Sequence, residues 1–175
     1  PVRETSSTQR LESLGDVMYF HRMVQGLLQQ WDAYSEAHHD TWRRLYERQR
    51  KTLDGKASPL YLSGLDSMSG SLTCDTVPKV SAMETQLQEA TGWSLTIVPG
   101  LIDVQDFFRL LAAKRFCTST WVRRPDQLDY IEEPDMFHDT FGHIPPLMNQ
   151  DFAAFMHRFG EVGAALVQAG MDRAV

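Results

Sequence analysis

Two histidines five residues apart, in a segment that also carries helix-ending residues, constrain the fold of this chain more than any other feature. His138 and His143 lie in residues 130–146, where Gly142 and Pro145 are residue types that end helices. On a regular helix, five residues turn through about 500°, so the two side chains would point roughly 140° apart. We therefore predict a short helix that breaks at Gly142 and swings His143 back towards His138.

The spacing of the two histidines also limits the kind of metal site that they can form. Zinc proteases place their ligands one helical turn apart in a His-Glu-x-x-His pattern, which this chain does not contain. Two histidines with a carboxylate and open coordination positions suit non-haem Fe(II) and oxygen chemistry. The spacing alone leaves other interpretations open, namely two histidines that cap a turn, or one buried and one exposed.

Composition and charge narrow the class of protein. The 175 residues are 42% hydrophobic and 23% charged, with a net charge of −6, so nucleic acid and anionic membranes are not expected as partners. No stretch is long and apolar enough to span a bilayer, and no secretory signal is visible. Cys74 and Cys117 lie far apart and are expected to be reduced thiols. These features predict a soluble, cytoplasmic protein.

The hydrophobic pattern predicts a mainly α fold with a few short strands. Residues 1 to about 10 are polar, and apolar residues then recur at helical spacing up to Trp31, so residues 1–34 are expected to form a tail and a helix. A short helix and a loop are expected between Gly55 and Pro78. The other predicted helices cover residues 42–53, 81–92, 103–111 and 152–166, and the predicted strands cover residues 93–97 and 120–122.

Particular residues are expected to set the ends of these helices. Asp40 and Asp103 are the predicted N-caps of the helices that follow them. Ser81 and Glu84 form a predicted capping box, and Gly92 ends the helix that they begin.

The segment around the histidines resembles the metal-binding signature of the aromatic amino acid hydroxylases. The matching residues are Glu133-Pro134-Asp135, His138, Gly142-His143 and Pro145, joined upstream by Gly92-Trp93, Pro99-Gly100-Leu101, Asp106-Phe107-Phe108 and Trp121-Val122-Arg123, and downstream by Phe152-Ala153. With residues 42–49, the chain is most similar to the bacterial phenylalanine 4-hydroxylases. Residues 1–34 match least, so residues 35–175 are expected to form a partial hydroxylase catalytic domain.

The resemblance implies an enzyme in which Fe(II) and a tetrahydropterin activate O2 to hydroxylate an aromatic amino acid, with L-phenylalanine converted to L-tyrosine. His138 and His143 match the family's iron ligands. Arg123 matches the residue that holds the substrate carboxylate, and Asp135 matches the acid that braces this arginine. Pro134 matches a residue that lines the pocket for the substrate ring. Without the resemblance, Arg123 and Asp135 could equally be a surface ion pair.

Three further residues are implied in pterin binding. Phe107 matches the aromatic residue that stacks on the pterin, although its spacing alone would also suit a core residue. Ile102 lies where the family backbone contacts the ring. Asp139 falls where many relatives carry the longer glutamate, and Cys117 has no assigned role.

The family's third iron ligand is a glutamate that lies more than 32 residues (175 − 143) beyond His143, so the chain is expected to be truncated at its C-terminus. Glu161 or Asp172 could replace it in principle, whereas Asp139 should point about 100° away from His138 on a helix. Two hypotheses follow: a monooxygenase whose remaining segment lies outside this chain, and a non-catalytic metal- or pterin-binding protein that keeps the fold. No feature predicts the oligomeric state.

Overall fold

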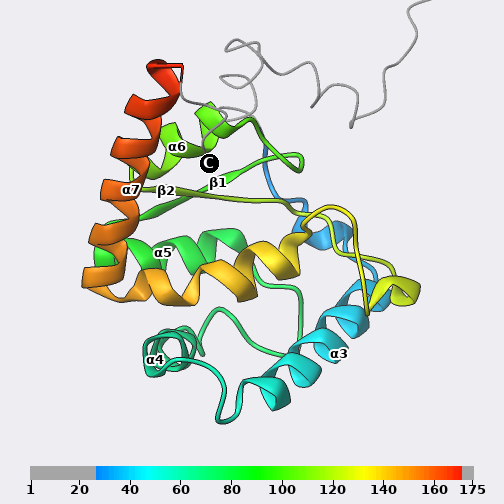
Figure 1. Ribbon diagram of the computed structural model, residues 1–175. Coiled ribbons are helices and arrows are strands. Elements are labelled where there is room, and N and C mark those ends of the chain that lie inside the picture. The colour runs from blue at the N-terminus through cyan, green and yellow to red at the C-terminus, as the bar shows by residue number, and fades with distance from the viewer. Residues whose placement is uncertain (1–26, 171–175) are drawn as a thin grey trace, which may run out of the picture.

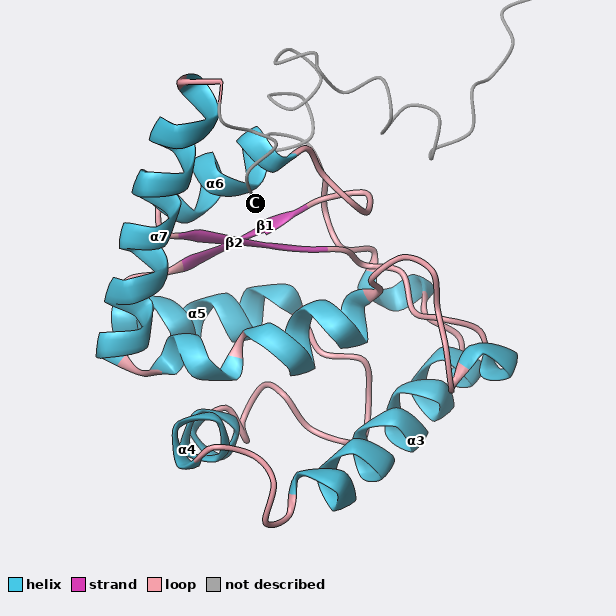
Figure 2. Cartoon of the chain, in the orientation of Figure 1, coloured by secondary structure: helices cyan, strands magenta, loops and turns pink. Residues whose placement is uncertain are grey.

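The computed structural model describes residues 27–170 of the chain, and within them helices surround a single pair of strands (Figure 1, Figure 2). The elements are η1 (Trp31–Ala33), α3 (Glu36–Leu53), α4 (Pro59–Ser67), α5 (Val80–Thr91), β1 (Ser94–Ile97), α6 (Val104–Ala112), β2 (Arg115–Thr118), η2 (Pro125–Gln127), η3 (His138–Gly142), η4 (Pro145–Met148) and α7 (Gln150–Gln168). The predicted mainly α fold with a few short strands is confirmed. Most of the predicted N-terminal helix lies outside the described residues, and its predicted end is wrong, since residues 27–30 are not helical.

The strands β1 and β2 are parallel, and α6 connects them. The register pairs Ser94 with Arg115 and Ile97 with Thr118. Parallel strands need a crossover connection, which is why a helix separates two strands that are neighbours in the sheet. The segments that follow the two strands, residues 98–103 and 119–123, therefore start at the same edge of the sheet.

The strand pair lies between two layers of helices, as Figure 1 shows, with α6 on one side and α5 on the other. α7 packs along α6. A Cβ atom at Gly160 would lie 2.5 Å from the Leu111 Cβ, and one at Gly163 would lie 2.2 Å from the Phe108 ring. Glycine at these two positions therefore lets α7 approach α6 closely.

One core runs through both layers and includes the segment that carries the histidines. Its largest fully buried side chains are Trp42, Trp93, Phe141, Leu65, Met68, Leu72, Met83, Leu87, Leu111, Met136, Ile144 and Leu147. Phe137 and Phe141 stack with ring centroids 4.9 Å apart, and Trp42 meets Phe137 edge-on at 5.1 Å. The helical run from 136 to 148 is thus anchored by its own apolar side chains.

Two predicted helix ends are confirmed. Gly92 has φ 74° and ψ 19°, the left-handed conformation that glycine adopts readily, and it ends α5. The Asp103 carboxylate accepts a hydrogen bond of 2.8 Å from the Gln105 backbone N–H at the start of α6.

Two other predicted caps are wrong, the first because Ser35 and His38 form a capping box further upstream and the second because a partner outside the helix binds the glutamate. Helix α3 begins after Ser35, so Asp40 lies within the helix, where it pairs with Arg43 at 3.2 Å. Helix α5 begins after Lys79, and the Glu84 carboxylate accepts the Leu95 backbone N–H of β1 at 3.1 Å instead of completing a capping box with Ser81.

The predicted strand at residues 120–122 is also wrong, since the second strand is β2 at Arg115–Thr118. Residues 120–122 bond to segments that are not strands. The Tyr34 hydroxyl donates to the Thr120 carbonyl, and the Met136 N–H donates to the Trp121 carbonyl at 2.9 Å. The Met136 bond ties the segment after β2 to the start of the histidine helix, and the Tyr34 bond ties it to the segment before α3.

Candidate metal centre and its two cavities

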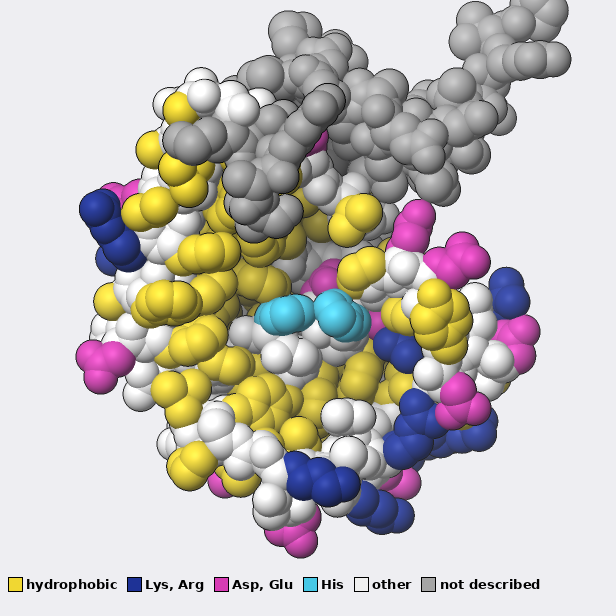
Figure 3. Space-filling view, viewed as in Figure 1, with side chains coloured by type: hydrophobic (Ala, Val, Ile, Leu, Met, Phe, Trp, Pro, Cys, Tyr) yellow, Lys and Arg dark blue, Asp and Glu magenta, His cyan; other side chains and the backbone are white. Residues whose placement is uncertain are grey.

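His138 and His143 face each other, with their Nε2 atoms 3.1 Å apart. Figure 3 shows histidine side chains together in the middle of one face, with apolar side chains around them. The predicted helix break at Gly142 is wrong. The chain instead forms a π-helical turn from His138 to Gly142, and His143 keeps right-handed helical angles. Because hydrogen bonds in a π-helix span five residues, positions five apart lie over one another, and the two rings meet without a break.

The geometry of the two imidazoles fits a shared metal ion. Two nitrogen ligands about 2.1 Å from a metal and about 90° apart lie roughly 3.0 Å from each other. Burial, and to a smaller degree His138, lowers the pKa of His143, although part of this residue is exposed. Its ring lies against Phe116, with centroids 5.5 Å apart. A lowered pKa favours the neutral imidazole, which is the form that binds metals.

A third ligand does not join the two histidines within residues 27–170, where no group of three or more His, Cys, Asp and Glu side chains could hold a metal ion. Glu161 lies on α7 and pairs with Arg158 at 2.9 Å. Asp172 lies outside the described residues. The described part of the chain therefore offers two of the three side chains that a facial triad would require.

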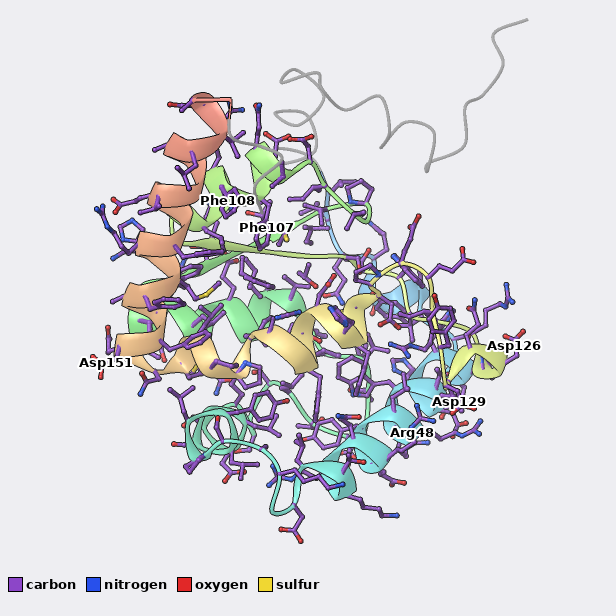
Figure 4. All side chains as sticks on the ribbon, in the orientation of Figure 1. Arg48, Phe107, Phe108, Asp126, Asp129 and Asp151 are labelled. Atoms are coloured by element: carbon purple, nitrogen blue, oxygen red, sulfur yellow. The ribbon has the colours of Figure 1, made fainter. Side chains whose placement is uncertain are left out.

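The larger of two cavities beside the histidines has a volume of about 490 Å³ and a mainly apolar wall. Ile102, Phe107, Pro134 and Asp139 line it together with both histidines. Figure 4 places Phe107 and Phe108 next to each other on α6, and Phe108 is buried whereas Phe107 is only half-buried. Part of the Phe107 ring is therefore open to a ligand.

Asp139 reaches this cavity although a regular helix would direct it away from the histidines. Its carboxylate accepts the Ser119 backbone N–H at 2.8 Å. Burial is the main cause of a raised pKa for Asp139. Burial and the nearby Asp139 also raise the pKa of Cys117 to about 12, so this thiol in the cavity wall stays protonated.

Arg123 and Asp135 form a buried ion pair. The Asp135 carboxylate is fully buried, the Arg123 side chain is 10% exposed, and the guanidinium donates from Nε at 2.9 Å and from Nη2 at 2.8 Å. The backbone N–H groups of Arg123 and His138 donate to the same carboxylate at 3.1 and 3.0 Å. The alternative of a surface ion pair is therefore wrong, and Asp135 fixes both the arginine and the start of the histidine turn.

A second cavity of about 390 Å³ lies on the other side of His138, which lines both. Arg123 lines this smaller cavity, together with Arg48, Tyr61 and Phe141. The three residues predicted to bind substrate are thus divided. Pro134 faces the larger cavity, Arg123 faces the smaller one, and Asp135 lies behind the arginine.

The sequence analysis did not identify two residues that hold this site. Tyr61 donates its hydroxyl to the Phe141 carbonyl at 2.5 Å, and Ser119 binds Asp139 through its backbone. Tyr61 lies 80 residues away from its partner, and a backbone donor carries no side-chain signal, so no local pattern indicates either contact.

A family model described as biopterin-dependent aromatic amino acid hydroxylase matches residues 3–172. Among similar proteins, the phenylalanine-4-hydroxylase of Ralstonia nicotianae is 44% identical over 137 residues, which are 78% of this chain and 43% of that protein. The phenylalanine-4-hydroxylase of Chromobacterium violaceum is also 44% identical over 137 residues, 78% of this chain and 46% of that protein.

Solved structures of the Chromobacterium violaceum phenylalanine hydroxylase are similar to the chain in fold. The cobalt-bound structure has a TM-score of 0.81 at 38% identity and covers 97% of this chain and 59% of its own. A structure with bound iron(III) and oxidised cofactor 7,8-dihydrobiopterin has a TM-score of 0.78 at 39% identity. The match covers 94% of this chain and 58% of that one. The chain therefore spans about half the length of the proteins that it matches. Across residues 27–170, no helix has both the length and the apolar character of a membrane span.

Proposed function

Because the chain belongs to the biopterin-dependent aromatic amino acid hydroxylase family, we propose that it forms part of an iron- and tetrahydropterin-dependent monooxygenase. The reaction proposed is the conversion of L-phenylalanine and O2 to L-tyrosine, since the similar bacterial proteins carry the name phenylalanine-4-hydroxylase. The proposed location is the cytoplasm. The observation that carries the proposal is the convergence of the His138 and His143 Nε2 atoms at 3.1 Å. Residues 35–175 would be part of the catalytic domain.

His138 and His143 hold the iron in this proposal, and a carboxylate from outside the described residues completes the ligand set. The bound iron would supply the activation of O2 at a centre open to both the tetrahydropterin and the amino acid substrate. Burial lowers the pKa of His143, which favours the neutral imidazole, and the turn aims both rings at one point. Its apolar cavity wall limits the access of water to that point.

The pterin is assigned to the larger cavity. A half-buried Phe107 offers a face for a flat ring, and Ile102 offers backbone groups beside it. Asp139 is the acceptor for a pterin N–H, with its carboxylate oriented by the Ser119 backbone. A mostly apolar cavity with a few fixed polar groups is the usual form of a cofactor site.

The amino acid substrate is assigned to the region between His138, Arg123 and Pro134. Asp135 binds Nε and Nη2 of Arg123, and among the described residues no hydrogen bond engages Nη1. We assign that nitrogen to the substrate carboxylate, while Pro134 contacts the substrate ring. Because Asp135 already holds the Arg123 guanidinium through two hydrogen bonds, the arginine needs little reorganisation when substrate binds.

The test is a tyrosine-formation assay on the full-length polypeptide that contains residues 1–175, supplied with Fe(II), tetrahydropterin, O2 and L-phenylalanine. The expected result is tyrosine formation that requires the pterin and is lost in His138→Ala. The alternative function is non-catalytic metal or pterin binding, for which the two histidines and the larger cavity are the parts required. Saturable pterin binding without any tyrosine would support that alternative and contradict the monooxygenase.

A further inference from the structure

The Phe141 carbonyl, in the turn between the two histidines, cannot obtain a hydrogen-bond donor from its own helix. An α-helix would bring the N–H of residue 145 to it, and a π-helix would bring that of residue 146. Both are prolines and have no N–H. The N–H of Ile144 is engaged by the Thr140 carbonyl at 3.1 Å. Since Phe141 is buried, leaving this carbonyl unpaired would be costly.

Tyr61 of α4 supplies the missing donor. Its hydroxyl donates to the Phe141 carbonyl at 2.5 Å, and its ring meets the Phe141 ring edge-on at 6.2 Å. Burial raises the pKa of the Tyr61 hydroxyl, so the group stays protonated and remains a donor around neutral pH.

Helix α4 is also fixed against η4, which directly follows the histidine turn. A Cβ atom at Gly64 would lie 1.9 Å from the Pro145 carbonyl oxygen, so the two backbones touch there. The start of α4 is also fixed, because Ser58 accepts the Tyr61 N–H at 3.2 Å and Pro59 occupies the first turn. Tyr61 is therefore presented to the histidine turn by a helix that has little freedom to move.

We propose that Tyr61 is a positioning residue for the two histidines, His138 and His143. By binding the Phe141 carbonyl it holds the π-helical turn in the form that brings the Nε2 atoms of His138 and His143 together. The inference rests on the proposed function, since it assumes that this pair binds a metal. Without the hydroxyl, the buried Phe141 carbonyl has no donor, and the turn is held less firmly in the geometry that brings the two Nε2 atoms together.

The experiment compares Tyr61→Phe with Tyr46→Phe in the 175-residue chain. Tyr46 is a matched control because it is also half-buried and edge-on to Phe141 at 5.0 Å, but its hydroxyl bonds to the Leu72 carbonyl at 3.4 Å. Titration with Co(II) alone, followed by its visible spectrum, is expected to show about 10-fold weaker binding for Tyr61→Phe. Tyr46→Phe is expected to bind as the unmodified chain does.

Amide hydrogen exchange of residues 138–144, measured by NMR without metal, provides the second readout. Tyr61→Phe is expected to accelerate exchange in this turn, and Tyr46→Phe to leave it unchanged. Equal Co(II) affinity and equal exchange in the two variants would overturn the positioning role. If the unmodified chain does not bind Co(II), the metal assignment fails, and the exchange rates alone decide whether Tyr61 holds the turn.

Discussion

Asp135 shows at the residue scale how the candidate site is held together. Its buried carboxylate accepts hydrogen bonds from the Arg123 side chain and from the backbone N–H groups of Arg123 and His138. One side chain thus orients the arginine proposed to bind substrate and the first histidine proposed to bind iron. Removing it would leave a buried guanidinium without its counter-charge.

Replacing Asp135 with alanine is therefore expected to lower the free energy of unfolding by about 3–5 kcal/mol, measured by urea denaturation. Asp129→Ala is the matched control. Asp129 also pairs with an arginine, Arg48, at 2.6 Å, but it is 95% exposed, and Figure 4 shows the two at the surface. The control is expected to change stability little. Similar losses in both variants would contradict the assignment of Asp135 as a buried anchor.

Cys117 gives a second prediction at this scale. Burial raises the pKa of both thiols, and the larger shift, to about 12, is that of Cys117, so iodoacetamide at pH 8 should modify Cys74 before Cys117. The raised pKa of Cys117 also makes the free energy of unfolding depend on pH. The stabilisation that the buried, protonated thiol contributes is fully present below the unfolded pKa of about 8.5, and it is lost as the pH rises towards 12. Mass spectrometry of the alkylated peptides checks the first expectation, and equal rates for the two thiols would refute it.

At the scale of elements, the π-helical turn is the feature on which the site depends, and α4 supports it from outside. Gly64→Ala should force α4 away from the Pro145 carbonyl and destabilise the fold by about 1–3 kcal/mol. Gly70→Ala serves as the control, since the nearest atom to its added Cβ would be 3.5 Å away. Thermal unfolding of both variants tests this contact, and a Gly64→Ala variant as stable as the control would show that the helices do not touch there.

The sequence predicted those elements whose signals are local. Gly92 and Asp103 act through their own backbone and their nearest neighbours, and both were identified. The capping box failed because Glu84 bonds instead to Leu95, a partner outside the helix. The histidine spacing indicated a departure from regular geometry, but an extra residue in one turn and a break at Gly142 look alike in a sequence.

At the scale of the whole molecule, one face of α7 is more apolar than a folded surface usually is. Phe155, Phe159 and Val162 are 61%, 41% and 44% exposed, and Leu101, near the mouth of the larger cavity, is 62% exposed. The chain also spans about half the length of its relatives. Exposed apolar patches of this kind commonly mark surfaces that bind other polypeptide.

Phe155→Gln is accordingly expected to reduce the binding of a fluorescent apolar dye while changing the free energy of unfolding by less than about 0.5 kcal/mol. The exposed position of Phe155 is the reason for the small effect on stability. Dye fluorescence and urea denaturation are measured on the same samples. A large loss of stability without a change in dye binding would mean that this ring belongs to the core.

The measurement that tests the metal centre most directly is an anaerobic calorimetric titration of residues 1–175 with Fe(II), beside His138→Ala and His157→Ala. His157 is the control histidine, since it lies on α7 with its ring beside the Ala112 carbonyl. We predict binding that is weak, because the described residues supply two ligands, and that is lost in His138→Ala but kept in His157→Ala. Equal Fe(II) binding by the unmodified chain and by His138→Ala would contradict the assignment of His138 and His143 as the iron ligands.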